Sequence, residues 1–226
     1  FIFEDEKCVI PEDEQAKFDA LSPAFSQLYL AINGVLSAVI CISDPLREEA
    51  RDVLSALQDL GVKNAVMLTG DSPRTAAAIA EQLGVDDFQA GVLPSDKADY
   101  VAALRREGHT VLMVGDGIND SPALSEADAG IAISDGAAIA REIADITIAA
   151  DSLWELVRLR QLAMALMHRI QNNYRFVIGF NGALIGLGVA GVLPPATSAM
   201  LHNLSTIGVS MRSMTNLLAP EGRNKL

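Results

Sequence analysis

Through the middle of this chain, short runs of apolar residues alternate with stretches in which apolar residues recur at helical spacing. Val53, Leu57 and Leu60 fall on one face of a predicted helix, and Ala65–Leu68 then forms a fully apolar run typical of a buried strand. The pattern predicts helices at 47–60, 72–83 and 95–106, strands at 65–68, 88–92, 110–114, 130–133 and 145–148, and short helices around Pro122 and Ala138. Strands that alternate with helices favour an α/β fold in which a parallel sheet has helices on both faces.

The N-terminal part has a different pattern. Residues 28–42 form two strand-like runs around Asn33-Gly34, a dipeptide favoured in tight hairpins. The chain begins at Phe1 without a methionine, and its first residues alternate like a strand that has no earlier partner. We therefore expect the sequence to be part of a longer protein.

The C-terminal part is predicted to be helical and membrane-embedded. A helical pattern over 151–176 leads to two apolar segments, 176–193 and 196–218, separated by Pro194-Pro195. Because ~20 helical residues at ~1.5 Å each cross a ~30 Å hydrocarbon core, both segments are long enough to span a membrane, and a soluble helical hairpin is the alternative. Positive residues flank both segments, which places both termini in the cytoplasm. Gly182 and Gly186 form a pair that favours close packing on another helix.

Composition limits the classes of partner. The net charge of −12 argues against a nucleic-acid partner, since phosphate backbones attract basic surfaces. Half of the residues are hydrophobic, which favours a buried core together with a membrane part. With two widely separated cysteines, the sequence encodes neither a disulfide framework nor a Cys-x-x-Cys metal site.

The clearest chemical signal is the string Gly-Asp-Gly-Ile-Asn-Asp at residues 115–120, directly after an apolar run. It places Asp116 and Asp120 four residues apart at the end of a strand. Mg²⁺ prefers oxygen ligands, often one or two carboxylates plus a substrate phosphate. We therefore predict an Mg²⁺ site at Asp116 and Asp120, supported by Gly115, Gly117 and Asn119, and the alternative is an ordinary polar turn.

Other chemical candidates follow neighbouring strands. Thr69 and Asp71 lie just past the strand at 65–68, and ligands in parallel sheets bind at such carboxyl ends. The Thr69 hydroxyl and nearby backbone N–H groups suit phosphoryl oxygens, and the Lys97 ammonium suits neutralisation of their charge. Lys97 could equally be a surface lysine, and Asp71 could serve only the start of the next helix.

Over nearly its whole length the chain resembles P-type ATPases, cation pumps with a haloacid-dehalogenase-like phosphorylation domain. Four motifs occur in the family's order: Asp44-Pro45-Leu46-Arg47, Thr69-Gly70-Asp71, Pro94-Ser95-Asp96-Lys97, and the string from Gly115 to Leu124. The resemblance implies catalytic roles for Thr69, Gly70, Asp71 and Lys97, a hinge on the nucleotide side at Asp44 and Arg47, and ATP with Mg²⁺ as cofactors. It also implies a membrane protein, most simply of a bacterial plasma membrane, with a cytosolic catalytic part.

The family's nucleophile motif, Asp-Lys-Thr-Gly-Thr, is absent from residues 1–226. Because that motif precedes the nucleotide-binding domain, the resemblance implies that the upstream half of the pump is missing and that this segment alone is inactive. Two other classes stay open: a membrane-anchored phosphatase of the dehalogenase superfamily, which would need an Asp-x-Asp motif that is not present, and a non-catalytic half-pump.

The resemblance further divides the chain into functional parts. They are 1–43, the tail of the nucleotide-binding domain and hinge; 44–150, a partial phosphorylation domain; 151–175, a cytosolic stalk helix; 176–218, two transmembrane helices; and 219–226, a cytosolic tail. Two spans after the catalytic domain resemble the heavy-metal branch, type IB.

In copper-exporting members of that branch, the last two spans contain Tyr-Asn and Met-x-x-Ser-Ser at the ion site. The corresponding residues here are Phe180-Asn181 and His202-x-x-Ser205-Thr206. Imidazole with hydroxyl and amide oxygens suits harder ions than thioethers do, so we expect a divalent transition metal bound by Asn181, His202, Ser205 and Thr206. The Lys and Asp usual in the zinc branch are missing, which leaves the identity of the metal open.

Overall fold

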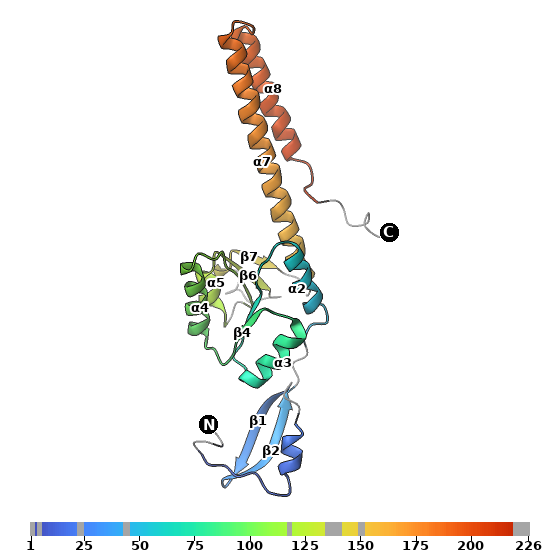
Figure 1. Cartoon of the computed structure of the whole chain (residues 1–226), viewed down its shortest axis with the longest axis vertical. Coiled ribbons are helices and arrows are strands. Elements are labelled where there is room, and N and C mark those ends of the chain that lie inside the picture. The colour runs from blue at the N-terminus through green and yellow to red at the C-terminus, as the bar shows by residue number, and fades with distance from the viewer. Residues whose placement is uncertain are drawn as a thin grey trace, which may run out of the picture. The chain divides into compact units, whose positions relative to one another are not determined.

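The computed structural model describes residues 3, 6–21, 25–42, 46–116, 119–133, 142–148 and 152–218 (Figure 1). The chain divides into two compact units, Phe1–Glu155 and Leu156–Leu226. We call them unit 1 and unit 2 and describe each by itself.

The N-terminal part of unit 1 contains a β-hairpin. Strands β1 (Ser26–Ile32) and β2 (Val35–Ile42) are antiparallel, with Leu28 opposite Ile40. Between them, Asn33 and Gly34 both have positive φ values, 52° and 78°, as required at the two central positions of a type I′ turn. The predicted hairpin is therefore confirmed. The short helix α1 (Gln15–Asp19) precedes it.

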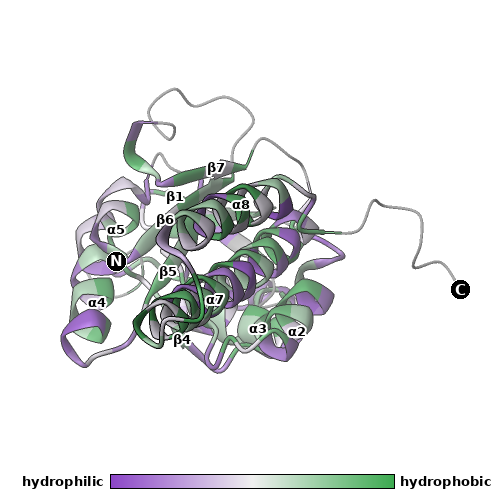
Figure 2. Ribbon diagram, turned by 90° about the horizontal axis from the view of Figure 1, so that it is seen from above, coloured by the Kyte–Doolittle hydropathy of each residue, from purple (hydrophilic) through white to green (hydrophobic). Residues whose placement is uncertain are grey.

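The rest of unit 1 is an alternation of helices and strands. Its elements are α2 (Ala50–Asp59), β3 (Val66–Leu68), α3 (Pro73–Leu83), β4 (Asp87–Gln89), α4 (Pro94–Arg106), β5 (Leu112–Gly115), α5 (Ser121–Glu126), β6 (Ala129–Ile133) and β7 (Ile146–Ile148). In Figures 1 and 2, α4 and α5 lie on one side of the strands and α2 and α3 on the other. The predicted helix around Ala138 lies outside the described residues.

Strands β3 to β7 pair in parallel, as predicted, but they form two sheets instead of one. β3 pairs with β4, and β5, β6 and β7 form a separate sheet in that order. β4 is also shorter than the predicted strand at 88–92. Gly91 has a φ of 66°, and its N–H donates to the Asp71 carbonyl, so the chain leaves the strand direction before that point.

Local signals set the ends of α3. The Ser72 hydroxyl accepts a hydrogen bond from the Thr75 N–H at 3.3 Å, Pro73 occupies the first turn, and Gly84 follows in the left-handed conformation. These signals agree with the helix that the sequence predicts over 72–83. The core of unit 1 is apolar, and its most buried large side chains are Val101, Leu124 and Ile131.

Unit 2 contains two helices, α7 (Trp154–Val189, whose first two residues belong to unit 1) and α8 (Pro195–Ser213). Their bounds differ from the predicted spans of 176–193 and 196–218. The apolar part of α7 begins at Phe176 and the helix ends at Val189, while α8 includes His202, Asn203 and several hydroxyl side chains. Figure 2 shows hydrophilic segments among the hydrophobic ones along α7. Within the described part of the chain, no helix combines the length and the apolar character needed to cross a membrane.

The two helices of unit 2 are joined by polar contacts. The Arg169 guanidinium donates to the carbonyls of Ser213, Thr215 and Asn216, and the Asn173 amide donates to the Ser213 hydroxyl at 2.9 Å. The predicted glycine pair takes no part in these contacts. No described atom lies within 4 Å of where a Cβ of Gly182 or Gly186 would stand, so this face of α7 is open.

Candidate active site

The predicted phosphate-binding residues follow β3. The Thr69 hydroxyl donates to Asp71 Oδ2 at 2.8 Å and accepts from the Asp71 N–H at 3.1 Å. Backbone hydrogen bonds join this loop to the one after β4: the Thr69 N–H donates to the Gln89 carbonyl, and the Val92 N–H donates to the Thr69 carbonyl. The carboxyl ends of β3 and β4 are therefore held side by side, with Thr69 and Asp71 at their edge and Gly70 exposed between them.

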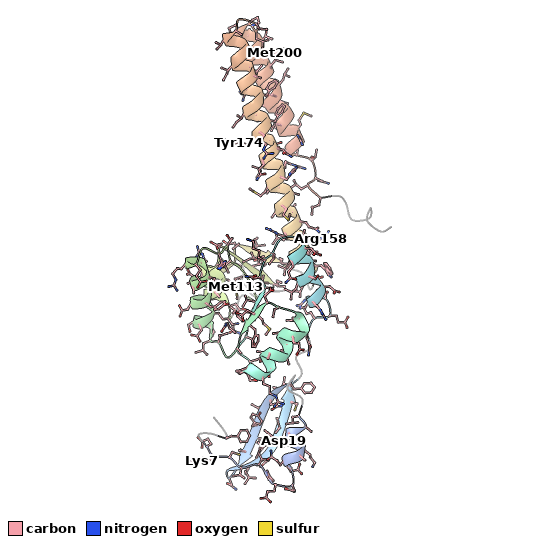
Figure 3. All side chains as sticks on the ribbon, viewed as in Figure 1. Lys7, Asp19, Met113, Arg158, Tyr174 and Met200 are labelled. Atoms are coloured by element: carbon pink, nitrogen blue, oxygen red, sulfur yellow. The ribbon has the colours of Figure 1, made fainter. Side chains whose placement is uncertain are left out.

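The second group of predicted residues follows β5, the strand marked by Met113 in Figure 3. Asp116 and Asn119 are exposed, and Asp120 directly precedes α5. The Asp120 carboxylate forms an ion pair with the Lys97 ammonium at 2.7 Å, and each side chain is 14% exposed. Both charges are thus largely removed from solvent, which strengthens the charge-assisted hydrogen bond.

The sequence did not predict this pairing. It assigned Lys97 to phosphate and Asp120 to Mg²⁺ separately, and the residues are 23 positions apart. Packing of α4 against α5 brings them together. The Asp96 carboxylate caps the N-terminus of α4 by accepting from the Leu93 N–H at 3.0 Å, which fixes the turn from which Lys97 projects.

Gly115 is required by a close approach. A Cβ at this position would stand 2.7 Å from the Cβ and 2.9 Å from the Cγ of Asp120, far closer than nonbonded carbon atoms approach. The glycine at the end of β5 therefore leaves the space that the Asp120 side chain occupies. This gives Gly115 a steric role that its place in the motif only suggested.

The donor set fits Mg²⁺. Asp116 and Asp120 offer carboxylate oxygens and Asn119 an amide oxygen, which are hard ligands of the kind this ion prefers. Among the described residues, no group of three or more His, Cys, Asp or Glu side chains gathers as a metal site. Two carboxylates alone leave coordination positions for substrate phosphate and water, as is usual for this ion.

Two predicted site residues, Asp44 and Gly117, lie outside the described residues. Arg47 is exposed and precedes α2, where its carbonyl accepts from the Ala50 N–H at 3.0 Å.

In unit 2, the structure brings together two of the four predicted ligands of the transported metal. His202 Nδ1 lies 2.9 Å from Asn181 Oδ1, between α8 and α7. The hydroxyls of Ser205 and Thr206 both donate to the His202 carbonyl, at 2.8 Å and 3.1 Å. His202 and Asn181 also line an open groove of about 690 Å³ between the helices, whose other walls are mostly apolar.

The chain shows clear similarity to known proteins. A family model described as haloacid dehalogenase-like hydrolase matches residues 4–128. A zinc-exporting P-type ATPase of Mycobacterium marinum is 44% identical over 191 residues, 84% of this chain and 26% of that protein. A manganese-exporting P-type ATPase of Mycobacterium leprae is 43% identical over 82% of the chain and 26% of the relative. Copper-transporting ATPase 1 of Rhizobium meliloti is 44% identical over 84% of the chain and 23% of the relative.

A solved structure agrees with these matches. The crystal structure of a zinc-transporting PIB-type ATPase in the E2.Pi state superposes with a TM-score of 0.78 at 34% identity, covering 90% of this chain and 34% of that one. The chain spans about a quarter of the length of the curated relatives it matches. The chain therefore belongs to the haloacid dehalogenase-like hydrolase family, and over most of its length it matches one segment of the heavy-metal P-type ATPases.

Proposed function

We propose that residues 1–226 are part of an ATP-driven exporter of a divalent transition metal that works through an aspartyl-phosphate. The observation that carries the proposal is the set of polar and charged groups at the carboxyl ends of β3 and β5, above all the Lys97–Asp120 pair. The chain's relatives include zinc-exporting, manganese-exporting and copper-transporting ATPases, which supports the class of protein and leaves the metal open.

The sheet supports the view that the nucleophile comes from elsewhere in a longer protein. Among the described strands, β3 pairs only with β4, and β5 only with β6, so β3 and β5 each have an unpaired edge. Parallel strands are normally buried inside a continuous sheet. One further parallel strand between β3 and β5 would join the two sheets, and its carboxyl end would emerge between Thr69 and Asp116. An aspartate there would be well placed to accept a phosphoryl group.

The described residues would divide the chemistry among them. Thr69 and the backbone at Gly70 would donate hydrogen bonds to the phosphoryl oxygens, and Lys97 would neutralise their charge. Asp116 and Asp120 would hold Mg²⁺, which lowers the negative charge at the reacting phosphate. Asp71 would help to manage the phosphoenzyme through its contact with Thr69, and Asp44 and Arg47 would form the hinge on the nucleotide side.

For the transported ion, we propose His202 as the principal ligand within this segment. A hydrogen bond from His202 Nδ1–H to Asn181 Oδ1 leaves the lone pair on Nε2, the atom that would bind a divalent metal. Asn181 then orients the ring, in the way that acceptor groups behind metal-binding histidines do. The hydroxyl oxygens of Ser205 and Thr206 keep lone pairs for further contacts to the ion.

We also propose that the α7–α8 hairpin belongs to the membrane part of the pump, together with helices outside this segment. Large apolar side chains stay exposed along both helices, among them Phe176, Ile185, Leu204 and Ile207. The open glycine face of α7 is suited to a neighbouring helix. On this proposal, residues 1–43 end the nucleotide-binding domain, 44–150 belong to the phosphorylation domain, 151–175 form the stalk, and 219–226 are cytosolic.

The test begins at the genomic locus, by extending the reading frame upstream of Phe1 and purifying the longer protein. Incubation with radiolabelled ATP and Mg²⁺ should give an acid-stable, hydroxylamine-sensitive phosphoprotein, whereas residues 1–226 alone should give none. Replacing the upstream aspartate with asparagine should abolish the label. A longer protein without any such label, or an equal label on residues 1–226, would overturn the proposal.

The metal is tested in the same preparation. Zn²⁺, Mn²⁺ and Cu⁺ are compared for stimulation of ATP hydrolysis in the unsubstituted protein, in His202→Ala and in the control Asn203→Ala. We expect stimulation by a divalent ion that His202→Ala lowers and Asn203→Ala does not. Stimulation by Cu⁺ alone would contradict the divalent assignment.

A further inference from the structure

Glu49 occupies the N-cap position of α2 but does not cap that helix. Its backbone carbonyl accepts the hydrogen bond from the Val53 N–H at 2.9 Å, while its side chain makes no capping contact to α2. The carboxylate is therefore available for another partner. That partner lies at the start of a different helix.

The Glu49 carboxylate accepts a hydrogen bond at 2.5 Å from the backbone N–H of Leu153, 104 residues further along the chain. Leu153 directly precedes α7, and the Ser152 hydroxyl accepts from the next amide, that of Trp154, at 3.3 Å. The first amides of a helix have no partner within the helix, and a negative charge near them is stabilising. Glu49 therefore acts as a remote cap on α7.

We propose that Glu49 is a positioning residue that couples the hinge at the entry to the phosphorylation domain to the helix that leaves it. Arg47, which we assign to the hinge, is two residues before Glu49, so a change of backbone direction there moves the carboxylate. The carboxylate in turn holds the first residues of α7, all of which lie in unit 1 with Glu49. This inference rests on the proposed function and adds a route between the hinge and the helix that contains Asn181.

The chain offers a matched control. Glu48 is the adjacent residue, has the same charge and is exposed. Glu48→Ala therefore removes the same charge from the same turn without removing the cap. Glu49→Gln keeps an oxygen that can accept from Leu153 and removes only the charge, whereas Glu49→Ala removes both.

The contact itself is tested by amide hydrogen exchange on residues 1–226. Loss of a charge-assisted hydrogen bond should raise the exchange rate of the amides at 152–156 by about tenfold in Glu49→Ala. Glu49→Gln should give a smaller rise, and Glu48→Ala none. The exchange rates of the amides in α3 are the control, because they would rise only if the whole unit lost stability. Unchanged exchange at 152–156 in Glu49→Ala would overturn the capping role.

The coupling is tested in the longer pump reconstituted in vesicles. Glu49→Ala should lower metal-stimulated ATP hydrolysis and metal ions moved per ATP by about fivefold, while phosphoenzyme formation from ATP stays unchanged. Glu49→Gln should recover part of the loss, and Glu48→Ala should behave as the unsubstituted pump. An equal fall in phosphoenzyme formation would show a merely structural role and overturn the inference.

The two proposals fail in different ways. If the unsubstituted pump forms no phosphoenzyme, the proposed function is wrong and the coupling falls with it. If the pump is phosphorylated and transports metal, but Glu49→Ala transports as many ions per ATP as the unsubstituted pump, only the coupling is wrong.

Discussion

The two ends of the parallel strands in unit 1 both gather aspartates, yet the carboxylates are used differently. At the carboxyl ends, Asp71 contacts the Thr69 hydroxyl and Asp120 contacts the Lys97 ammonium. At the amino ends, the aspartates contact backbone N–H groups. The difference separates residues that build the sheet from residues that are available for chemistry.

Three aspartates at the amino ends share one arrangement. Asp86, Asp128 and Asp145 each stand one residue before a strand (β4, β6 and β7), and we call them the strand-start aspartates. Each accepts from an N–H within one residue of the start of the neighbouring strand: Ala65 at 2.7 Å, Val111 at 2.8 Å and Gly130 at 2.8 Å. These bonds provide acceptors for backbone N–H groups at the ends of the strands, and they fix the register of each parallel pair.

The comparison shows why an acidic residue beside a strand is a weak functional signal by itself. Each strand-start aspartate accepts a hydrogen bond from a backbone N–H, so its substitution should lower folding stability. Asp120 instead accepts from the Lys97 ammonium group, which under the proposed function also neutralises a bound phosphate. The following experiments, in order of expected effect, test this distinction.

We expect the largest effect when Asp120→Asn is compared with Asp128→Asn. The two aspartates flank α5 and lie at opposite ends of the sheet. In the proposed longer pump, Asp120→Asn should lower phosphoenzyme formation about 100-fold, because it weakens a proposed Mg²⁺ ligand beside the transferred phosphate. The free energy of unfolding of residues 1–226 should change by only about 1 kcal/mol, since asparagine can still accept from Lys97.

Asp128→Asn should give the opposite result. It weakens the contacts to the Val111 N–H and to Arg105, which lies 3.1 Å away, and should lower the free energy of unfolding by about 1–2 kcal/mol. Phosphorylation per folded molecule should not change. Urea denaturation followed by circular dichroism measures the first quantity and radiolabelled ATP the second. If Asp120→Asn and Asp128→Asn changed folding stability and phosphorylation to the same extent, the distinction between the two groups of aspartates would be wrong.

A second pair compares Gly115 with Gly130, on the paired strands β5 and β6. In Gly115→Ala the new methyl group would stand 2.7 Å from the Asp120 Cβ, which the backbone holds in place, so folding stability and phosphoenzyme formation should both fall. In Gly130→Ala the methyl group would stand 2.6 Å from the Leu124 carbonyl oxygen, which is backbone. We expect about 1–3 kcal/mol of lost folding stability there. Gly130→Ala should leave phosphoenzyme formation per folded molecule unchanged, and an equal loss of phosphoenzyme in the two variants would contradict this.

A third experiment shows that position at the carboxyl end does not by itself make a residue catalytic. Ser72 directly follows Asp71 but caps α3 through the Thr75 N–H. Ser72→Ala should cost about 1 kcal/mol of folding stability and leave phosphoenzyme formation unchanged. The control is Ser125→Ala, an exposed serine in α5. A loss of phosphorylation without a loss of stability would assign Ser72 to the site.

The smallest effect concerns Tyr100 on α4. Burial, followed by the charges of Asp87 and Glu107, raises the pKa of the Tyr100 phenol above its ordinary value of 10.0. A group whose pKa is raised in the folded state contributes stability that is complete below the unfolded pKa and is lost as the pH rises through the folded pKa. As the pH rises from 8 to values above 10.0, the free energy of unfolding of residues 1–226 should therefore fall less in Tyr100→Phe than in the unsubstituted chain. An equally steep alkaline loss in both would exclude this contribution.

How far the sequence predicted this structure depended on whether the signal was local. The Asn33-Gly34 turn and the helix over 72–83 depend on local backbone angles and capping groups, and both were confirmed. The single sheet and the strand over 88–92 were wrong in detail, since strand pairing and strand ends depend on neighbours distant in sequence. The spans at 176–193 and 196–218 followed apolar content, which does not determine where a helix ends.

By itself the sequence determined which residue types stand at the strand ends, since the order of strands, helices and motifs follows from periodicity and turn chemistry. It placed Thr69, Asp71, Asp116 and Asp120 correctly after strands. Only the tertiary structure decided which charges meet. The Lys97–Asp120 pair joins two elements, the Glu49–Leu153 bond joins residues 104 apart, and the strand-start aspartates contact neighbouring strands. The physical reason is that ion pairs and hydrogen bonds act over about 3 Å, and packing, rather than sequence spacing, brings distant groups within that range.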